Sequence, residues 1–123
     1  MRVLVCGGRD YKNHHAVYRE LDALAKEHGW LTIIEGGARG ADRHAQNWAK
    51  NHYHGLVTVM AEWQIHGNAA GPIRNAQMLK HAKPDLVLAF PTGGPGTQDM
   101  IDQTRAAGVE LRVIEEKKGL GLC

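Results

Sequence analysis

The sequence contains no serine, two cysteines and one phenylalanine in 123 residues. Without serine the chain cannot use a serine nucleophile, so the Gly-x-Ser-x-Gly chemistry of α/β-hydrolases is excluded. Cys6 ends an apolar run and Cys123 is the last residue, and neither belongs to a Cys-x-x-Cys or other metal-binding pattern. We therefore expect Cys6 to be a buried thiol and the protein to occupy a reducing, cytoplasmic environment.

Long apolar runs and a large excess of one charge are also absent. The formal net charge is +2, and the hydrophobic and charged fractions of 43% and 23% are ordinary for a soluble globular protein. The first residues, MRVLVCGG, have too short an apolar part for a signal peptide or a membrane-spanning helix. We therefore expect one domain without membrane association and without the broadly basic surface that binds polyanions.

Five short apolar runs predict the strands of a sheet. They are rich in Val, Ile and Leu and mostly continuous rather than alternating, which is typical of strands covered on both faces. The runs span residues 3–6, 32–35, 56–61, 86–90 and 111–114.

Helical periodicity appears between these runs. In the first interval apolar residues recur at i, i+4, i+7 and i+8, with Asn13 as the predicted N-cap and Gly29 as the stop. Three further helices are predicted over residues 41–52, 72–83 and 97–108. For the last of them Thr97 is the predicted N-cap and Gly108 the stop.

The resulting order, β-α-β-α-β-α-β-α-β, predicts an α/β fold. Right-handed crossovers between parallel strands place helices on both faces of the sheet. We expect a single Rossmann-like three-layer domain over residues 1–116, with a five-stranded, mostly parallel sheet. A flexible C-terminal tail is expected over residues 117–123.

Glycine-rich stretches follow three of the predicted strands: GGRD (7–10), GGARGAD (36–42) and PTGGPGT (91–97). Ligands of open parallel sheets bind beyond the carboxyl ends of the strands, where glycine lets the backbone approach a ligand and helix N-termini attract anions. Three such loops on one edge favour a phosphate-bearing ligand over simple turns. None of them matches a Walker A loop or the dinucleotide fingerprint, so we expect neither an ATPase nor a conventional NAD enzyme, and no cofactor.

Charged side chains on the same edge supply further contacts. Guanidinium groups offer forked donors to phosphate, and carboxylates accept hydrogen bonds from ribose hydroxyls or a base edge, unless they only cap helices. The arginines are Arg9, Arg39 and Arg74, and the carboxylates are Asp10, Asp42 and Asp99.

Histidine and tryptophan are two further residue types that could have a function here. The chain has 8 histidines, but His52 and His54 form an HxH pair without a matching carboxylate or cysteine cluster, so no metal site is predicted. Trp63, after the third predicted strand, could stack on a base, be buried or contact a second subunit.

Three motifs in order, GGARGAD, GPIRNAQM and PTGGPGTQDM, resemble those of the SLOG superfamily, the Rossmann-like proteins related to LOG and to DNA-processing protein A. The chain is most similar to the small stand-alone YspA-like branch, and the resemblance spans nearly its whole length. LOG enzymes hydrolyse the N-glycosidic bond of cytokinin-type nucleoside 5′-monophosphates. The resemblance implies that Arg74 corresponds to the catalytic arginine, followed by Asn75. It also implies that the glycine loop from Pro91 to Thr97 binds phosphate.

The chain departs from the LOG signature near the end of the last motif. Met100 stands where LOG enzymes have a glutamate, and a thioether cannot act as an acid or a base. Asp99 precedes it, about 100° away around a helix. Arg74 and Asp99 are therefore the candidate catalytic residues. The departure favours a ligand that is sensed rather than turned over.

The leading prediction is a sensor or binding domain for a nucleotide or nucleotide-derived ligand of the AMP or ADP-ribose type. A LOG-like phosphoribohydrolase and a single-stranded nucleic-acid binding protein are the alternatives. LOG-like proteins commonly form dimers and Trp30 and Trp63 could serve an interface, so a homodimer is expected. The predicted ligand-binding residues are Gly7, Gly8, Arg9, Asp10, Gly36, Gly37, Ala38, Arg39, Gly40, Asp42, Arg74, Asn75, Pro91, Thr92, Gly93, Gly94, Gly96 and Thr97.

Overall fold

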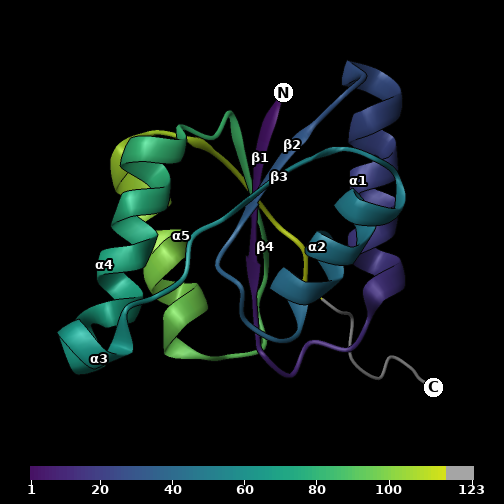
Figure 1. Ribbon diagram of the computed structural model, residues 1–123. Coiled ribbons are helices and arrows are strands. Elements are labelled where there is room, and N and C mark those ends of the chain that lie inside the picture. The colour runs from purple at the N-terminus through teal and green to yellow at the C-terminus, as the bar shows by residue number, and fades with distance from the viewer. Residues whose placement is uncertain (116–123) are drawn as a thin grey trace.

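The computed structural model describes residues 1–115 as alternating strands and helices (Figure 1). The strands are β1 (Arg2–Gly7), β2 (Thr32–Glu35), β3 (Gly55–Thr58), β4 (Leu86–Phe90) and β5 (Glu110–Val113). The α-helices are α1 (His14–His28), α2 (Ala41–Asn51), α3 (Trp63–His66), α4 (Ala70–Gln77) and α5 (Pro95–Ala107). A 3₁₀ turn (Gly67–Ala69) joins α3 to α4, and a π-helical turn (Met78–Ala82) extends α4. The tail predicted over residues 117–123 lies outside the described residues.

The five strands form one sheet in the order β3-β2-β1-β4-β5, and every neighbouring pair is parallel. The chain builds outward from β1 to β3 and then returns to the other side of β1 for β4 and β5. The strand order therefore reverses between β1 and β4. Helices α1 and α2 cover one face of the sheet, and α4 and α5 cover the other (Figure 1). The predicted α/β fold with a five-stranded sheet is confirmed.

Alternating side chains of β1 supply both halves of the core. Val3 and Val5 belong to the cluster under α1 and α2, whereas Leu4 and Cys6 belong to the cluster under α4 and α5. The central strands β1 and β4 are apolar on both faces because helices cover both faces there. The edge strand β5 instead alternates, with Glu110 and Arg112 exposed. Cys6 is buried, as predicted, and burial raises the pKa of its thiol.

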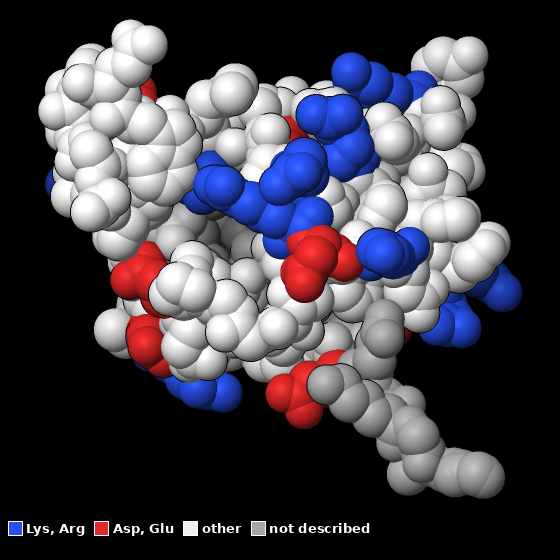
Figure 2. Space-filling view, turned by 90° about the horizontal axis from the view of Figure 1, so that it is seen from below, with Lys and Arg blue, Asp and Glu red and all other residues white. Residues whose placement is uncertain are grey.

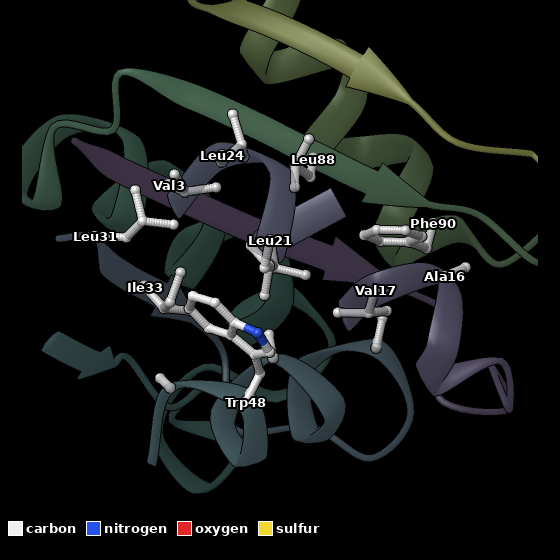
Figure 3. Packing of buried hydrophobic residues seen from close by; sticks show 14 of the residues in the cluster. Val3, Ala16, Val17, Leu21, Leu24, Leu31, Ile33, Trp48, Leu88 and Phe90 are labelled. Atoms are coloured by element: carbon white, nitrogen blue, oxygen red, sulfur yellow. The ribbon is translucent and has the colours of Figure 1, made fainter. Parts of the chain in front are cut away.

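Trp48 of α2 is the largest side chain of the larger cluster (Figure 3). Its indole is 1% exposed and packs among Leu21 of α1 and Ile33 of β2. The indole N–H donates a hydrogen bond of 2.8 Å to Asp22 Oδ1, so the polar atom of this large side chain keeps a partner.

Three of the four predicted ends of α1 and α5 are confirmed. The Asn13 side chain accepts a hydrogen bond from Ala16 N at 3.1 Å, and Gly29 follows α1 at φ 80°. Gly108 ends α5 at φ 71°. However, α5 begins at Pro95 rather than after Thr97, because proline at a first helical position has the helical φ already set. Helix α3 was not predicted, since its residues form no apolar stripe.

No helix within residues 1–115 combines the length and the hydropathy that crossing a bilayer requires. The two tryptophans expected at an interface are partly exposed, Trp30 by 62% and Trp63 by 47%. They lie at opposite ends of the sheet, because Trp30 precedes β2 and Trp63 follows β3.

Candidate functional site

A cavity of about 320 Å³ lies at the carboxyl ends of β1 and β4, where the strand order reverses. Figure 2 views this edge of the molecule and shows a hollow beside a band of Lys and Arg side chains. Binding sites of open parallel sheets form at such positions, because the loops on either side of the reversal diverge. The cavity is lined by Val5, Cys6, Gly7, Arg9, Ala38, Asp42, Arg74, Asn75, Met78, Gly94, Pro95, Gly96, Thr97 and Met100.

Arg74 of α4 is fixed across the cavity by two hydrogen bonds. Its Nη1 donates to the Gly36 carbonyl oxygen at 2.9 Å, and its Nε donates to Asn75 Oδ1 at 3.0 Å. A Cβ at position 36 would lie 2.1 Å from Arg74 Nη1, so glycine is required there for the guanidinium to reach the β2–α2 loop. No hydrogen bond joins Nη2 to residues 1–115, and this group remains available to a ligand.

Asp42 is the carboxylate of this cavity. It lies in the first turn of α2, is 5% exposed, and accepts hydrogen bonds on Oδ2 from Gly36 N (3.0 Å) and Ala38 N (3.3 Å). Burial raises the pKa of Asp42 to about 6, and nearby Glu35 adds to the rise, while the two N–H donors and Arg74 oppose it. Within residues 1–115 both hydrogen bonds end on Oδ2, which leaves Oδ1 for a ligand.

The start of α5 forms the opposite wall. Gly94 is its N-cap residue, and no side chain of the described residues caps this helix end. A Cβ at Gly94 or at Gly96 would meet no atom within 4 Å, although both residues line the cavity. Packing therefore does not require glycine at either position. The small residues leave the N-terminal N–H groups of the helix open to an anion.

The glycine loops of β1 and β2 pack directly against each other. Gly40 has φ 74°, and a Cβ there would lie 2.1 Å from the Gly8 carbonyl oxygen. On the other side of the β1 loop, the Thr92 hydroxyl donates to Asp10 Oδ1 at 2.7 Å, and this bond lowers the pKa of Asp10. These contacts hold the three loops together as one rim.

The structure brings half of the predicted ligand-binding residues into the cavity lining. They are Gly7, Arg9, Ala38, Asp42, Arg74, Asn75, Gly94, Gly96 and Thr97. Four others, Asp10, Pro91, Thr92 and Gly93, line a second, adjacent depression of about 690 Å³. Gly8, Gly36, Gly37, Arg39 and Gly40 belong to the same loops but line neither space.

Asp99 does not line the cavity. Its Oδ2 accepts hydrogen bonds from Asn75 Nδ2 at 3.0 Å and from Gln103 Nε2 at 2.7 Å, so this carboxylate ties α5 to α4. Met100, one residue later, is 1% exposed and does line the cavity.

Sequence reasoning missed five lining residues: Val5, Cys6, Met78, Pro95 and Met100. Two signals were available: Cys6 ends a strand that precedes a glycine loop, and Met100 stands where LOG enzymes have a glutamate. The other apolar side chains cannot be told from core residues by their spacing. No group of three or more His, Cys, Asp or Glu side chains within residues 1–115 is arranged to hold a metal ion.

The arrangement combines an uncapped helix N-terminus, a fixed arginine and one carboxylate of raised pKa in a single concave space. The first two favour an anion such as a phosphate, and the third favours hydroxyl groups. The cavity is therefore suited to a phosphorylated sugar or nucleotide.

Two comparisons with known proteins bear on this site. A family model described as YspA, cpYpsA-related SLOG family matches residues 1–66, which include the β1 and β2 loops and Trp63. Gene 61 protein of Mycobacterium phage D29 is 36% identical over 117 residues, which cover 89% of this chain and 93% of the phage protein.

Proposed function

Because the chain belongs to the YspA, cpYpsA-related SLOG family, we propose that it binds a nucleotide or nucleotide-derived ligand of the AMP or ADP-ribose type in the cavity between β1 and β4. The chain serves in this proposal as a sensor or binding domain. The SLOG membership that the three motifs predicted is confirmed. Family membership supports a nucleotide-related role, and the choice of ligand class rests on the site.

The observation that carries the proposal is the pairing of Arg74 with the uncapped start of α5 in one cavity. Backbone N–H groups at a helix N-terminus and a guanidinium are two common partners of phosphate in proteins. Glycine at position 96 supports the same conclusion, since glycine inside a helix costs about 0.5–1 kcal/mol relative to alanine and packing does not require it here.

The rest of the cavity suits a ribose. Asp42 Oδ1 can accept a hydrogen bond from a sugar hydroxyl. The side chain of Asn75, which is 4% exposed, accepts a hydrogen bond from Arg74 and donates one to the Gly96 carbonyl oxygen, so it holds Arg74 in place relative to α5. Burial strengthens such hydrogen bonds, because water competes less for them.

Calorimetric titration of AMP, ADP-ribose and adenosine tests the proposal. We expect AMP to bind at least about tenfold more tightly than adenosine, because charge-assisted hydrogen bonds contribute about 1.5–3 kcal/mol each. Arg74→Gln should remove most of this difference, whereas Arg105→Gln, in the exposed last turn of α5, should not. Equal binding of AMP and adenosine, or no binding of any of the three, would refute the proposal.

One observation favours a second candidate, hydrolysis of the N-glycosidic bond of a nucleoside 5′-monophosphate. Asp42 is a buried carboxylate within the cavity, and a pKa of about 6 allows it either to take a proton from an attacking water or to stabilise positive charge on the ribose. Water would add its oxygen to the ribose C1′, and its proton would leave with the base.

Chromatography of AMP incubated with the protein tests this candidate through release of free adenine. Asp42→Asn should abolish any release, and Asp99→Asn should leave it nearly unchanged, since Asp99 lies outside the cavity. The opposite ranking of the two variants would contradict a catalytic role for Asp42.

A further inference from the structure

Trp63 stands at an unusual place for a large apolar side chain. It begins α3, a helix with no buried residue, and the 3₁₀ turn that follows has none either. Figure 1 shows α3 beside the start of α4, at the edge of the sheet where the strands end. A helix this short and this exposed contributes little to the core. We therefore looked for a function of Trp63 at the surface.

The contacts of Trp63 place its indole at the mouth of the cavity. The guanidinium carbon of Arg9 lies 5.7 Å from the centre of the indole ring, and Arg9 lines the cavity. On the other side, a Cβ at Gly71 would lie 3.5 Å from Trp63 Cη2. Gly71 is in the first turn of α4, the helix that carries Arg74. The indole therefore lies between the β1 loop and the helix that supplies the fixed arginine.

Arg9 covers the indole through a replaceable interaction. Its side chain is exposed and makes no hydrogen bond or ion pair with the residues that the structure describes. A cation–π contact at an exposed site changes an equilibrium by about two- to fivefold. Stacking of a nucleic-acid base on an aromatic side chain changes it by about 5- to 150-fold. A base can therefore displace the guanidinium from the indole.

We propose that Trp63 is the base-stacking residue of the nucleotide site, and that a bound base replaces Arg9 on the indole while Arg9 turns to the phosphate of the ligand. This inference rests on the proposed function and narrows it. The ligand class is a nucleotide whose base stays unburied at the cavity mouth, rather than a sugar phosphate. Stacking alone does not distinguish the bases, because every base has a π-face.

The exchange links the two ends of the ligand. When the base takes the indole face, the positive charge of Arg9 is released beside the cavity that already holds Arg74. Base and phosphate therefore bind cooperatively. A ligand that has only a base or only a phosphate binds more weakly, because it does not use both the indole and the released Arg9.

Titration of AMP and of ribose 5-phosphate against wild type, Trp63→Ala and Trp63→Phe tests the proposal. We expect Trp63→Ala to weaken AMP binding by about tenfold, Trp63→Phe to weaken it by less than about threefold, and ribose 5-phosphate binding to change less than about twofold. Ile65→Ala is the matched control, since Ile65 is 69% exposed on the same helix. Because Trp63 is 47% exposed, circular dichroism should show all variants folded.

Two results would overturn the proposal while leaving the proposed function intact. In one, AMP binds wild type and Trp63→Ala equally well. In the other, Trp63→Ala weakens AMP and ribose 5-phosphate by the same factor and turns a dimer into a monomer in light scattering, which would make Trp63 a subunit contact. Failure of wild type to bind either compound would instead refute the proposed function, and this inference with it.

Discussion

Replacing Asp42 with asparagine should stabilise the protein at neutral pH while it impairs the site. The asparagine side chain would keep an oxygen that can accept from Gly36 N and Ala38 N, so the substitution removes the charge and little else. The pKa of Asp42 rises from 3.8 to about 6 on folding, which corresponds to about 3 kcal/mol of lost stability once the group is ionised. That figure already includes the favourable attraction to Arg74 and the repulsion from Glu35.

The sign of the pH dependence follows from the direction of the shift. The folded protein holds the Asp42 proton more tightly than the unfolded chain does. The contribution of Asp42 to the free energy of unfolding is therefore greatest below about pH 4 and is lost as the pH rises through about 6. The neutral amide of the Asp42→Asn variant has no such loss. The variant should therefore exceed wild type by about 3 kcal/mol at pH 7.5 and by less than about 1 kcal/mol at pH 4.

Urea denaturation followed by circular dichroism at pH 4 and pH 7.5 measures both differences. Asp102→Asn is the matched control, because Asp102 is an exposed carboxylate on α5 and its removal should change stability by less than about 0.5 kcal/mol at either pH. An Asp42→Asn variant that is no more stable than wild type at pH 7.5, or that exceeds wild type by the same amount at both pH values, would contradict a raised pKa of Asp42 in the folded protein.

Three further substitutions distinguish a residue needed for ligand binding from residues needed for the stability of the fold. Gly96→Val should weaken AMP binding in calorimetry by more than about tenfold without loss of stability, because valine has the better helix propensity and its side chain enters open space. Retained AMP affinity would show that the glycine does not serve the ligand. Gly40→Ala should destabilise by more than about 1 kcal/mol in urea, because its φ is 74° and the new Cβ would meet the Gly8 carbonyl, so an unchanged midpoint would contradict the packing described for the rim. Trp48→Ala should lower the free energy of unfolding by about 3–5 kcal/mol, and a loss below about 1 kcal/mol would contradict the burial of this indole in the core.

The sequence predicts those helices and strands whose boundaries depend on local patterns, such as apolar runs and turn residues. The runs at residues 32–35 and 86–90 match β2 and β4 end to end, because continuous Ile, Val and Leu bounded by turn residues admit few alternatives. The predicted start of α5 was wrong, because Pro95 competes with Thr97 for the first turn. Helix α3 has no apolar periodicity and no buried residue, so the sequence carries no pattern from which to predict it.

The sequence predicts which loops form the candidate site, but it does not predict which side chains line the cavity. Glycines mark the edge of the sheet, yet only the packing of α4 against α5 decides that Met78 and Met100 reach the cavity. The same packing ties Asp99 to Asn75 and away from the cavity. Asp42 becomes the one carboxylate of the lining because burial under the β2 loop, which no local pattern reports, brings it beside Arg74.

A crystal structure of the protein soaked with AMP would show directly whether the nucleotide occupies the cavity between β1 and β4. We expect the phosphate at the start of α5, within hydrogen-bonding distance of the backbone N–H groups of Gly96 and Thr97 and of the Arg74 guanidinium. AMP ordered away from α5 and Arg74, or an empty cavity at millimolar AMP, would contradict the proposed function.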